Sequence, residues 1–414
     1  MNPFPRVNGE LHAEGLALSE LAERFGTPCY VYSRAALVTG FRAFDDAFAG
    51  TDHLVCYAMK ANSNLAVLNL LARQGSGFDI VSGGELARVI AAGGDPAKVV
   101  FSGVGKAAAE MEAALAAGIL CFNVESAAEL DVLNAVAGRV GKTAPVSFRV
   151  NPDVDPRTHP YIATGLKESK FGIAFADAVA LYRRAAALPH VAVRGIDCHI
   201  GSQITDLSAC TEAAARVFGL VDRIEADGIA LDHVDLGGGI GIRYRDEETI
   251  DPQSYARAVR RELGARRHRL LFEPGRFLVG NAGILLTRVL YLKPGDSHHF
   301  AIVDAAMNDF IRPALYDAWH DVDVVRPREG ESRCWQIVGP VCESGDFLAR
   351  DRELALAAGD LLALRGAGAY GFVMSSNYNS RPRACELIVD GDRAHIVRAR
   401  ETNAELYANE VVLP

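Results

Sequence analysis

The stretch His53-Leu54-Val55-Cys56-Tyr57-Ala58-Met59 is a short, mainly apolar run, and Lys60-Ala61-Asn62 follows it directly. A run of this length and apolarity predicts a buried strand. Similar runs recur along the first two thirds of the chain, and several are separated by alanine-rich amphipathic segments such as Gly84–Ala92, Ala107–Ala117 and Ala127–Ala137. Strands that alternate with helices predict βαβ units and a parallel sheet.

The number of these runs favours one architecture. About eight units over roughly 240 residues is the size of a (β/α)8 TIM-like barrel, and a doubly wound open sheet is the competing α/β architecture. The count and the polar residues at several strand ends favour the barrel. The runs expected as barrel strands are Leu54–Met59, Phe78–Val81, Val99–Ser102, Leu120–Val124, Val146–Val150, Arg194–His199, His233–Leu236 and Leu270–Phe272.

The pattern changes from about Gly280 onward. Helical periodicity fades, and runs such as Gly283–Leu292 and Cys334–Val338 alternate with Gly, Pro and Asp turns, which predicts a β-rich second domain. The strand-like run Cys29-Tyr30-Val31-Tyr32 is expected to join this domain. We therefore expect three parts, namely an N-terminal segment of the β domain at residues 1–36, a barrel at 37–280 and a C-terminal β domain at 281–414.

Composition and charge exclude several classes of protein. The 414 residues include 43 Lys and Arg against 52 Asp and Glu, so the net charge of -9 does not suggest a nucleic-acid partner. The N-terminus, Met1 to Glu14, is polar, and no stretch approaches the roughly 18 apolar residues of a membrane span. The eight cysteines are scattered and form no Cys-x-x-Cys pair. These features predict a protein of the reducing cytoplasm without membrane or nucleic-acid partners.

Lys60 is expected where a strand opens into a loop, which is where α/β folds place their chemistry. Val55, Tyr57 and Met59 would partly exclude water from its amine, which disfavours the charged form and makes the amine available as a nucleophile. Such an amine can form a Schiff base with an aldehyde. Most lysines after a strand are solvated, so this position is a weak indication by itself.

Two polar loops follow the seventh and eighth predicted strands. Gly237-Gly238-Gly239-Ile240-Gly241 would let backbone amides approach an anion, although a tight turn explains it equally well. Glu273-Pro274-Gly275-Arg276 would project a carboxylate and a guanidinium from a turn, and a salt bridge within the loop is the simpler explanation. Because barrels commonly bind phosphate after strands seven and eight, the two loops together favour a phosphate site.

Other candidate residues are less specific one by one. His199 closes the sixth predicted strand and could stack on a planar cofactor, while Ser202 could reach a phosphate. The loop Gly339–Asp346 contains Cys342, which could be a proton donor. His298-His299 has no nearby Cys or Glu partners, so no metal site is predicted.

Taken in order, these motifs resemble the fold-type III pyridoxal-phosphate decarboxylases over nearly the whole chain. Each motif is modestly specific, and the ordered set is highly so. The segment His159–Gly165 with Lys170–Gly172 is similar to the flexible active-site loop of that family, with Ala163 where a serine is more frequent. The motifs are Tyr57–Asn62, Phe78–Leu86, His199–Gln203, Gly237–Gly241, Glu273–Arg276 and Cys342–Asp346.

The resemblance implies a cofactor, pyridoxal 5'-phosphate, and a role for each matching residue. Lys60 would hold the cofactor, Glu273 would keep its pyridine nitrogen protonated, and Cys342 would protonate the α-carbon. The remaining implied cofactor contacts are His199 on the ring, the phosphate contacts Ser202, Gly238, Gly239, Gly275 and Arg276, and Tyr370. The implied substrate contacts are Arg276, Arg312, Tyr316, Glu343 and Tyr370.

The implied reaction is decarboxylation of meso-2,6-diaminopimelate to L-lysine, the last step of lysine biosynthesis. The implied assembly is a homodimer whose active sites are shared between the two chains. Two alternatives stay open at this point. The chain could be a same-fold decarboxylase of ornithine, lysine, arginine or carboxynorspermidine, or it could be a non-catalytic regulatory homologue. The presence of both Lys60 and Cys342 argues against the second alternative.

Overall fold

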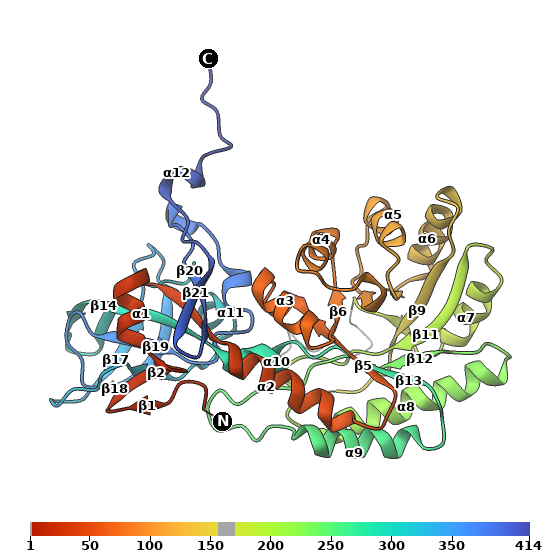
Figure 1. Ribbon diagram of the computed structural model, residues 1–414, viewed down its shortest axis with the longest axis horizontal. Helices are drawn as coiled ribbons and strands as arrows, with labels where there is room; N and C mark the ends of the chain where they lie inside the picture. Colours follow the sequence, from red (N-terminus) through yellow and green to blue (C-terminus); the bar gives the residue numbers. More distant parts are fainter. Residues whose placement is uncertain (1, 156–169) are drawn as a thin grey trace. The chain divides into compact units, whose positions relative to one another are not determined.

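The computed structural model describes residues 2–155 and 170–414. It divides into two compact units (Figure 1). The barrel unit comprises residues 41–243 and 247–277, and the sheet unit comprises residues 1–40, 244–246 and 278–414.

The barrel unit contains a closed ring of eight parallel strands among the described residues. Pairing of Leu271 with Leu54, between the last strand and the first, closes the ring. In spatial order the strands are β5 (His53–Ala58), β6 (Gly77–Ile80), β7 (Val99–Phe101), β8 (Cys121–Val124), β9 (Ala144–Asn151), β11 (Val191–Asp197), β12 (His233–Asp235) and β13 (Arg269–Phe272). This ring confirms the predicted (β/α)8 barrel and excludes the open sheet.

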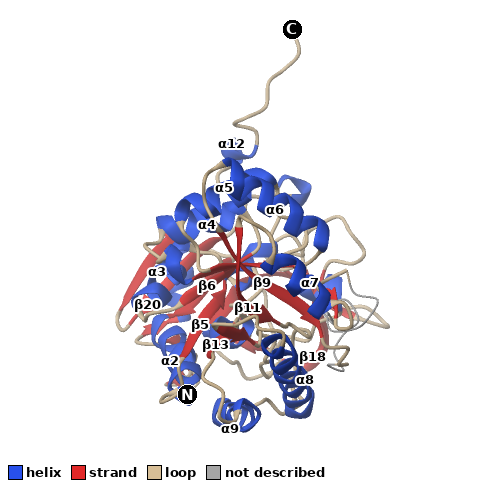
Figure 2. Cartoon of the chain, turned by 90° about the vertical axis from the view of Figure 1, so that its right-hand side faces the viewer, coloured by secondary structure: helices blue, strands red, loops and turns tan. Residues whose placement is uncertain are grey.

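Helices surround the ring, as Figure 2 shows. Several begin with a polar cap in the loop that follows a strand. Asn64, Ser82 and Ser126 each accept a hydrogen bond from a backbone N–H in the first helical turn. Such caps satisfy donors that the helix start would otherwise leave unpaired. The helices are α3 (Leu65–Arg73), α4 (Gly83–Ala91), α5 (Ala108–Ala117), α6 (Ala127–Arg139), α7 (Ala178–Ala186), α8 (Leu207–Ala226) and α9 (Pro252–Leu263).

Strand ends differ from the prediction at the positions that matter for chemistry. Strand β5 ends at Ala58, so Lys60 lies in the short 3-10 turn Met59–Ala61. Strand β11 ends at Asp197, two residues before His199. A further short strand, β10 (Ile173–Ala174), pairs with β9 and is too short for periodicity to reveal. The candidate side chains therefore sit on the loops that leave the carboxyl ends of the strands.

The sheet unit is built around β14 (Gly283–Lys293), which pairs antiparallel with β4 (Cys29–Ser33), β15 (His299–Val303) and β19 (Leu361–Leu364). Strand β4 also pairs with β20 (Cys385–Asp390), so the run around Tyr30 lies inside this sheet. The other strands are β1 (Arg6–Val7), β2 (Glu10–Ala13), β3 (Leu16–Ala17), β16 (Val322–Val324), β17 (Arg333–Val338), β18 (Phe347–Leu354) and β21 (Arg393–Arg398). The remaining helices are α1 (Leu18–Phe25), α2 (Arg34–Asp45), α10 (Arg276–Val279), α11 (Arg312–Tyr316) and α12 (Asn403–Leu406).

Two features bear on the expected environment. None of the described helices combines the length and the apolarity that crossing a bilayer requires. All eight cysteines are free thiols, and Cys342 is the one that is exposed on its unit.

Candidate active site

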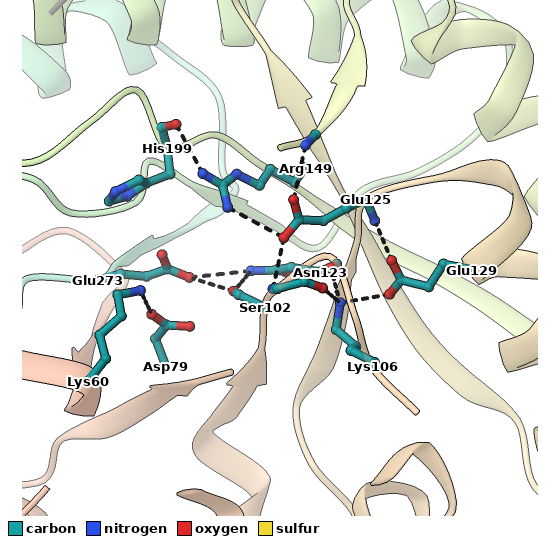
Figure 3. Close-up of polar contacts among 12 residues, drawn as sticks. Lys60, Asp79, Ser102, Lys106, Asn123, Glu125, Glu129, Arg149, His199 and Glu273 are labelled. Atoms are coloured by element: carbon teal, nitrogen blue, oxygen red, sulfur yellow. Dashed lines mark hydrogen bonds and ion pairs between the residues drawn. The ribbon is translucent and has the colours of Figure 1, made fainter. Parts of the chain in front are cut away.

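Lys60 faces a buried carboxylate across two neighbouring strands. Ala58 of β5 pairs with Asp79 of β6, and Lys60 follows two residues after Ala58. Its Nζ donates a hydrogen bond to Asp79 Oδ2 at 2.8 Å, as Figure 3 shows. The Asp79 side chain is fully buried, and the Lys60 side chain is 35% exposed.

This ion pair corrects the electrostatic argument from the sequence. Val55, Tyr57 and Met59 are buried as expected, but the amine lies beside a carboxylate, which favours its charged form. Asp79 therefore holds the Lys60 side chain at the barrel mouth through this contact. The Asp79 Oδ1 atom is buried and has no hydrogen bond within the described part of the chain. No role was predicted for Asp79 from the sequence. Its position near the end of the second barrel strand could have indicated that it lies at the active site.

His199 presents a neutral ring. Its Nδ1 lies 3.1 Å from the backbone nitrogen of Gly238, whose N–H donates to it. Burial lowers the pKa of the His199 imidazole well below its usual value, because desolvation disfavours the charged ring. Arg149 Nη2 donates to the His199 carbonyl at 3.4 Å and holds the backbone of this loop (Figure 3). A flat, uncharged ring in a fixed place suits stacking on a planar cofactor.

The glycine run is packed too closely for side chains. A Cβ added at Gly238 would lie 1.9 Å from the Glu273 carbonyl oxygen, and one at Gly239 would lie 2.2 Å from that of Gly201. Gly239 also has φ +96°, a backbone conformation that side-chain-bearing residues rarely adopt. The Gly238 N–H donates to His199, and the missing side chain of Gly238 allows the loops after β12 and β13 to pack against each other.

Arg276 and Ser202 meet beside this run. Arg276 Nη2 donates to Ser202 Oγ at 3.1 Å, and the Arg276 residue is buried. A Cβ at Gly275 would lie 3.1 Å from the Ala58 carbonyl oxygen, so the loop after β13 also touches the end of the Lys60 strand. The structure thus brings together the loops after β5, β11, β12 and β13, and places a guanidinium and a hydroxyl beside the glycine run.

The Gly238→Ala variant is expected to be less stable and to bind cofactor more weakly. Its added methyl would have to separate the loops after β12 and β13, and overpacking of this kind costs roughly 1–3 kcal/mol. Thermal unfolding and a cofactor titration measure the two effects. Gly219→Ala in α8 is the matched control, because a Cβ there meets nothing within 4 Å. A Gly238→Ala protein with the wild-type melting temperature and cofactor affinity would contradict this packing.

Glu273 lies among buried acids and is itself 3% exposed. Its Oε1 accepts hydrogen bonds from Asn123 Nδ2 at 3.3 Å and from Ser102 Oγ at 3.5 Å (Figure 3). One carboxyl oxygen each of Asp197, Asp235 and Glu273 lie within 4.8 Å of one another. Three carboxyl groups this close and this buried cannot all be ionised, so protons are shared among them.

Burial, and next the charges of Asp235 and Asp79, raise the pKa of the Glu273 carboxyl well above its usual value. A protonated ring nitrogen beside it would supply the positive charge that stabilises the carboxylate. Shared protons are sufficient to explain this acidic cluster, and the absence of a metal stays a prediction.

Arg312 and Tyr316 lie one turn apart on α11 in the sheet unit. The Arg312 guanidinium is 5.8 Å from the ring centroid of Tyr316 and 5.4 Å from that of Tyr244. Its Nε donates to His320 Nε2 at 3.3 Å. The structure therefore brings these two predicted substrate residues together and holds the guanidinium against aromatic faces.

Cys342 and Glu343 lie on the loop between β17 and β18. Asp346 fixes this loop by accepting hydrogen bonds from the backbone nitrogens of Met307 at 2.7 Å and Val341 at 2.8 Å. The Cys342 and Glu343 side chains are exposed on the sheet unit. Tyr370, in the same unit, has φ +55°, which is uncommon for a residue with a side chain.

Two groups of residues complete the comparison with the sequence. The predicted loop His159–Gly165 lies outside the described residues. Polar groups inside the barrel received no predicted role, because each is a single polar residue in or beside an apolar run. They are Asp79, Ser102, Asn123, Asp197 and Asp235.

Comparison with known proteins agrees with this geometry. Residues 34–280 match the family described as pyridoxal-dependent decarboxylase, pyridoxal binding domain. The chain is 63% identical over 414 residues to a diaminopimelate decarboxylase of Pseudomonas aeruginosa, with both chains fully covered. It resembles the crystal structure of diaminopimelate decarboxylase from M. jannaschii in complex with L-lysine, with a TM-score of 0.95, 38% identity, and coverage of 100% of this chain and 98% of that one. The corresponding Helicobacter pylori complex with L-lysine gives 0.92 and 43%, with coverage of 95% and 99%.

The chain belongs to the pyridoxal-dependent decarboxylases, and its cofactor is pyridoxal 5'-phosphate. Within that family its place is with the diaminopimelate decarboxylases, the name carried by its full-length relatives.

The residues of the barrel mouth fit this cofactor. An amine stands at the end of β5, and a buried carboxyl group at the end of β13 needs a cationic partner to ionise. Glycines line a turn where no Cβ could be accommodated, beside a buried arginine and a serine. These are the groups that an aldehyde, a pyridine nitrogen and a phosphate respectively require.

Proposed function

We propose that this enzyme decarboxylates meso-2,6-diaminopimelate to L-lysine and carbon dioxide. The observation that carries the proposal is the convergence, at one barrel mouth, of the Lys60 amine, the neutral ring of His199 and the buried Glu273 carboxyl. The identity of the substrate is inferred from full-length relatives that bear the name diaminopimelate decarboxylase.

Each cofactor residue has a distinct task in this proposal. Lys60 binds the aldehyde carbon, Glu273 keeps the ring nitrogen protonated, and His199 stacks on the ring. When bound, pyridoxal phosphate supplies an electron-accepting ring that lowers the barrier to loss of carbon dioxide. The phosphate contacts are Ser202, Gly238, Gly239, Gly275 and Arg276, and Tyr370 touches both cofactor and substrate.

The distal end of the substrate distinguishes this reaction from related ones. Arg276, Arg312 and Tyr316 bind the remote carboxylate, and Glu343 binds the remote ammonium. A guanidinium can hold a carboxylate through two parallel hydrogen bonds. Ornithine and lysine have no remote carboxylate, so they would not form these hydrogen bonds. The proposal therefore predicts selectivity for diaminopimelate.

Cys342 returns a proton to the α-carbon. We propose that it does so in the neighbouring subunit of a homodimer, so that each active site contains residues of both chains. The exposure of Cys342 and Glu343 on a loop fixed by Asp346 supports this arrangement, since both side chains project from the surface of their own unit. The cytoplasmic location stays a prediction from the sequence.

Mixing two inactive proteins tests the shared site. Lys60→Ala and Cys342→Ala subunits are expected to form hybrid dimers in which one site carries both substitutions and the other carries neither. Under random exchange about half of the dimers are hybrid, so activity should recover to about a quarter of the wild-type value. Mixing Lys60→Ala with itself is the control. No recovery, with subunit exchange demonstrated by differently tagged chains, would place both residues in one chain.

A direct assay tests the reaction itself. Purified protein is supplied with pyridoxal phosphate and, in separate reactions, with meso-diaminopimelate, lysine, ornithine, arginine or carboxynorspermidine, and carbon dioxide release is followed. Release from diaminopimelate with formation of lysine is the expected result. Faster carbon dioxide release from another of these amino acids would identify that compound as the substrate. No release from any of them would favour a regulatory homologue.

A further inference from the structure

Asn123 is a fully buried amide inside the barrel. It lies on β8, and its side chain is 0% exposed. Asn123 Nδ2 donates to Ser102 Oγ at 3.1 Å and to Glu273 Oε1 at 3.3 Å. Figure 3 shows that Asn123 and Ser102 approach the same carboxyl oxygen of Glu273, Oε1, and that the other oxygen is turned away from them. A buried polar side chain of this kind is kept only where its hydrogen bonds are satisfied.

The orientation of the Asn123 amide follows from its neighbours. The Cys121 thiol donates to Asn123 Oδ1 at 3.7 Å, which identifies this atom as the amide oxygen. The amide nitrogen, Nδ2, therefore faces Glu273. The backbone is also fixed, because Lys106 Nζ donates to the Asn123 carbonyl at 2.7 Å. Lys106 is itself buried and paired with Glu129 at 2.7 Å. The donor therefore points at Glu273 from a rigid position.

The charges around Glu273 work against its ionised form. Burial, and next the charges of Asp235, Asp79 and Asp197, raise the pKa of the Glu273 carboxyl, while the charge of Lys60 opposes this shift. Hydrogen bonds donated to a carboxylate favour its charged form. Neutral donors do so without placing a second positive charge beside Glu273, where it would compete with the protonated ring nitrogen of the cofactor. Asn123 and Ser102 donate to this carboxyl group from outside the acidic cluster.

We propose that Asn123 is a positioning residue for the reaction. It aims the Glu273 carboxylate at the pyridine nitrogen of the cofactor and favours the charged form of that carboxylate, with Ser102 as a second donor. This inference rests on the proposed pairing of Glu273 with the ring nitrogen. A merely structural amide would stabilise the barrel but would not affect how strongly the enzyme recognises that one nitrogen atom.

The test compares pyridoxal phosphate with its 1-deaza analogue, in which a C–H group replaces the ring nitrogen. Their dissociation constants are measured by titration in the dark without substrate, so the readout is independent of turnover. The wild type should prefer pyridoxal phosphate. In Asn123→Ala this preference should fall about 5- to 10-fold, the effect of losing one hydrogen bond of ordinary strength. In Asn123→Asp it should fall further, because a fourth carboxyl group would adjoin Glu273.

Ser147→Ala is the matched control. Ser147 pairs with Asn123 across β8 and β9, is equally buried, and its hydroxyl has no hydrogen bond within the described part of the chain. This variant should keep the wild-type preference for pyridoxal phosphate. If Asn123→Ala does not fold, Ser102→Ala takes its place, with an expected fall of about 2- to 5-fold for the longer hydrogen bond.

Glu273→Gln separates this inference from the proposed function. A preference that falls in Glu273→Gln but is unchanged in folded Asn123→Ala would overturn the positioning role and leave the ring-nitrogen pairing intact. A preference unchanged in both variants would overturn the pairing and the positioning role together. An equal fall in Ser147→Ala and Asn123→Ala would show a general packing effect and would also reject the proposal.

Discussion

Lys60→Ala should lose decarboxylation by a factor of at least about 10³, because it removes both the covalent anchor of the cofactor and a nearby proton carrier. Borohydride reduction of the wild type should fix pyridoxal phosphate to Lys60, and peptide mass spectrometry of the digested protein locates the label. The variant should show no label at this peptide.

Lys98→Ala is the control for this substitution. Lys98 precedes β7 in the short turn Pro96–Lys98, at the opposite end of the strand from the active site. It should retain both the label at Lys60 and wild-type turnover. Normal turnover of Lys60→Ala with added cofactor would show that another residue holds the cofactor.

Glu343→Gln is expected to weaken catalysis with diaminopimelate by about 2–5 kcal/mol, the effect of removing one partner of a charge pair that the proposed dimer would bury. That range corresponds to a fall in kcat/KM of roughly 30- to 5000-fold. The substitution keeps the size of the side chain and an oxygen that can accept the hydrogen bond that Tyr378 now donates at 3.1 Å. The loop should therefore stay in place, so the loss would report the missing charge.

Glu331→Gln provides the comparison for a solvent-exposed acid. Glu331 is largely exposed and pairs with Arg333 at 2.9 Å, and exposed pairs contribute about 0–1 kcal/mol. Its kcat/KM should stay close to the wild-type value. Unchanged selectivity in Glu343→Gln, or a wild type that uses lysine or ornithine as well as diaminopimelate, would remove Glu343 from substrate recognition.

Periodicity was sufficient for the barrel because its strands are short, apolar and separated by amphipathic helices. Each predicted run, from Leu54–Met59 to Leu270–Phe272, contains the core of an observed strand. Hydrophobic burial acts on such runs locally, so their pattern can be read without a partner strand. The strand ends were less predictable. Strand β5 ends at Ala58 and β11 ends at Asp197, close to the polar residues of the loops that follow.

The (β/α)8 class and the β-rich remainder could be predicted from the hydrophobic pattern alone, and the ordered motifs indicated the family. The polar interior was decided by tertiary structure. Asp79 pairs with Lys60, and Asn123 reaches Glu273 across 150 positions of the chain. Nothing in a single polar residue within an apolar run reveals such a partner. The pairing arises because the closed ring turns alternate side chains of distant strands toward one interior, where a buried charge or amide must find a partner.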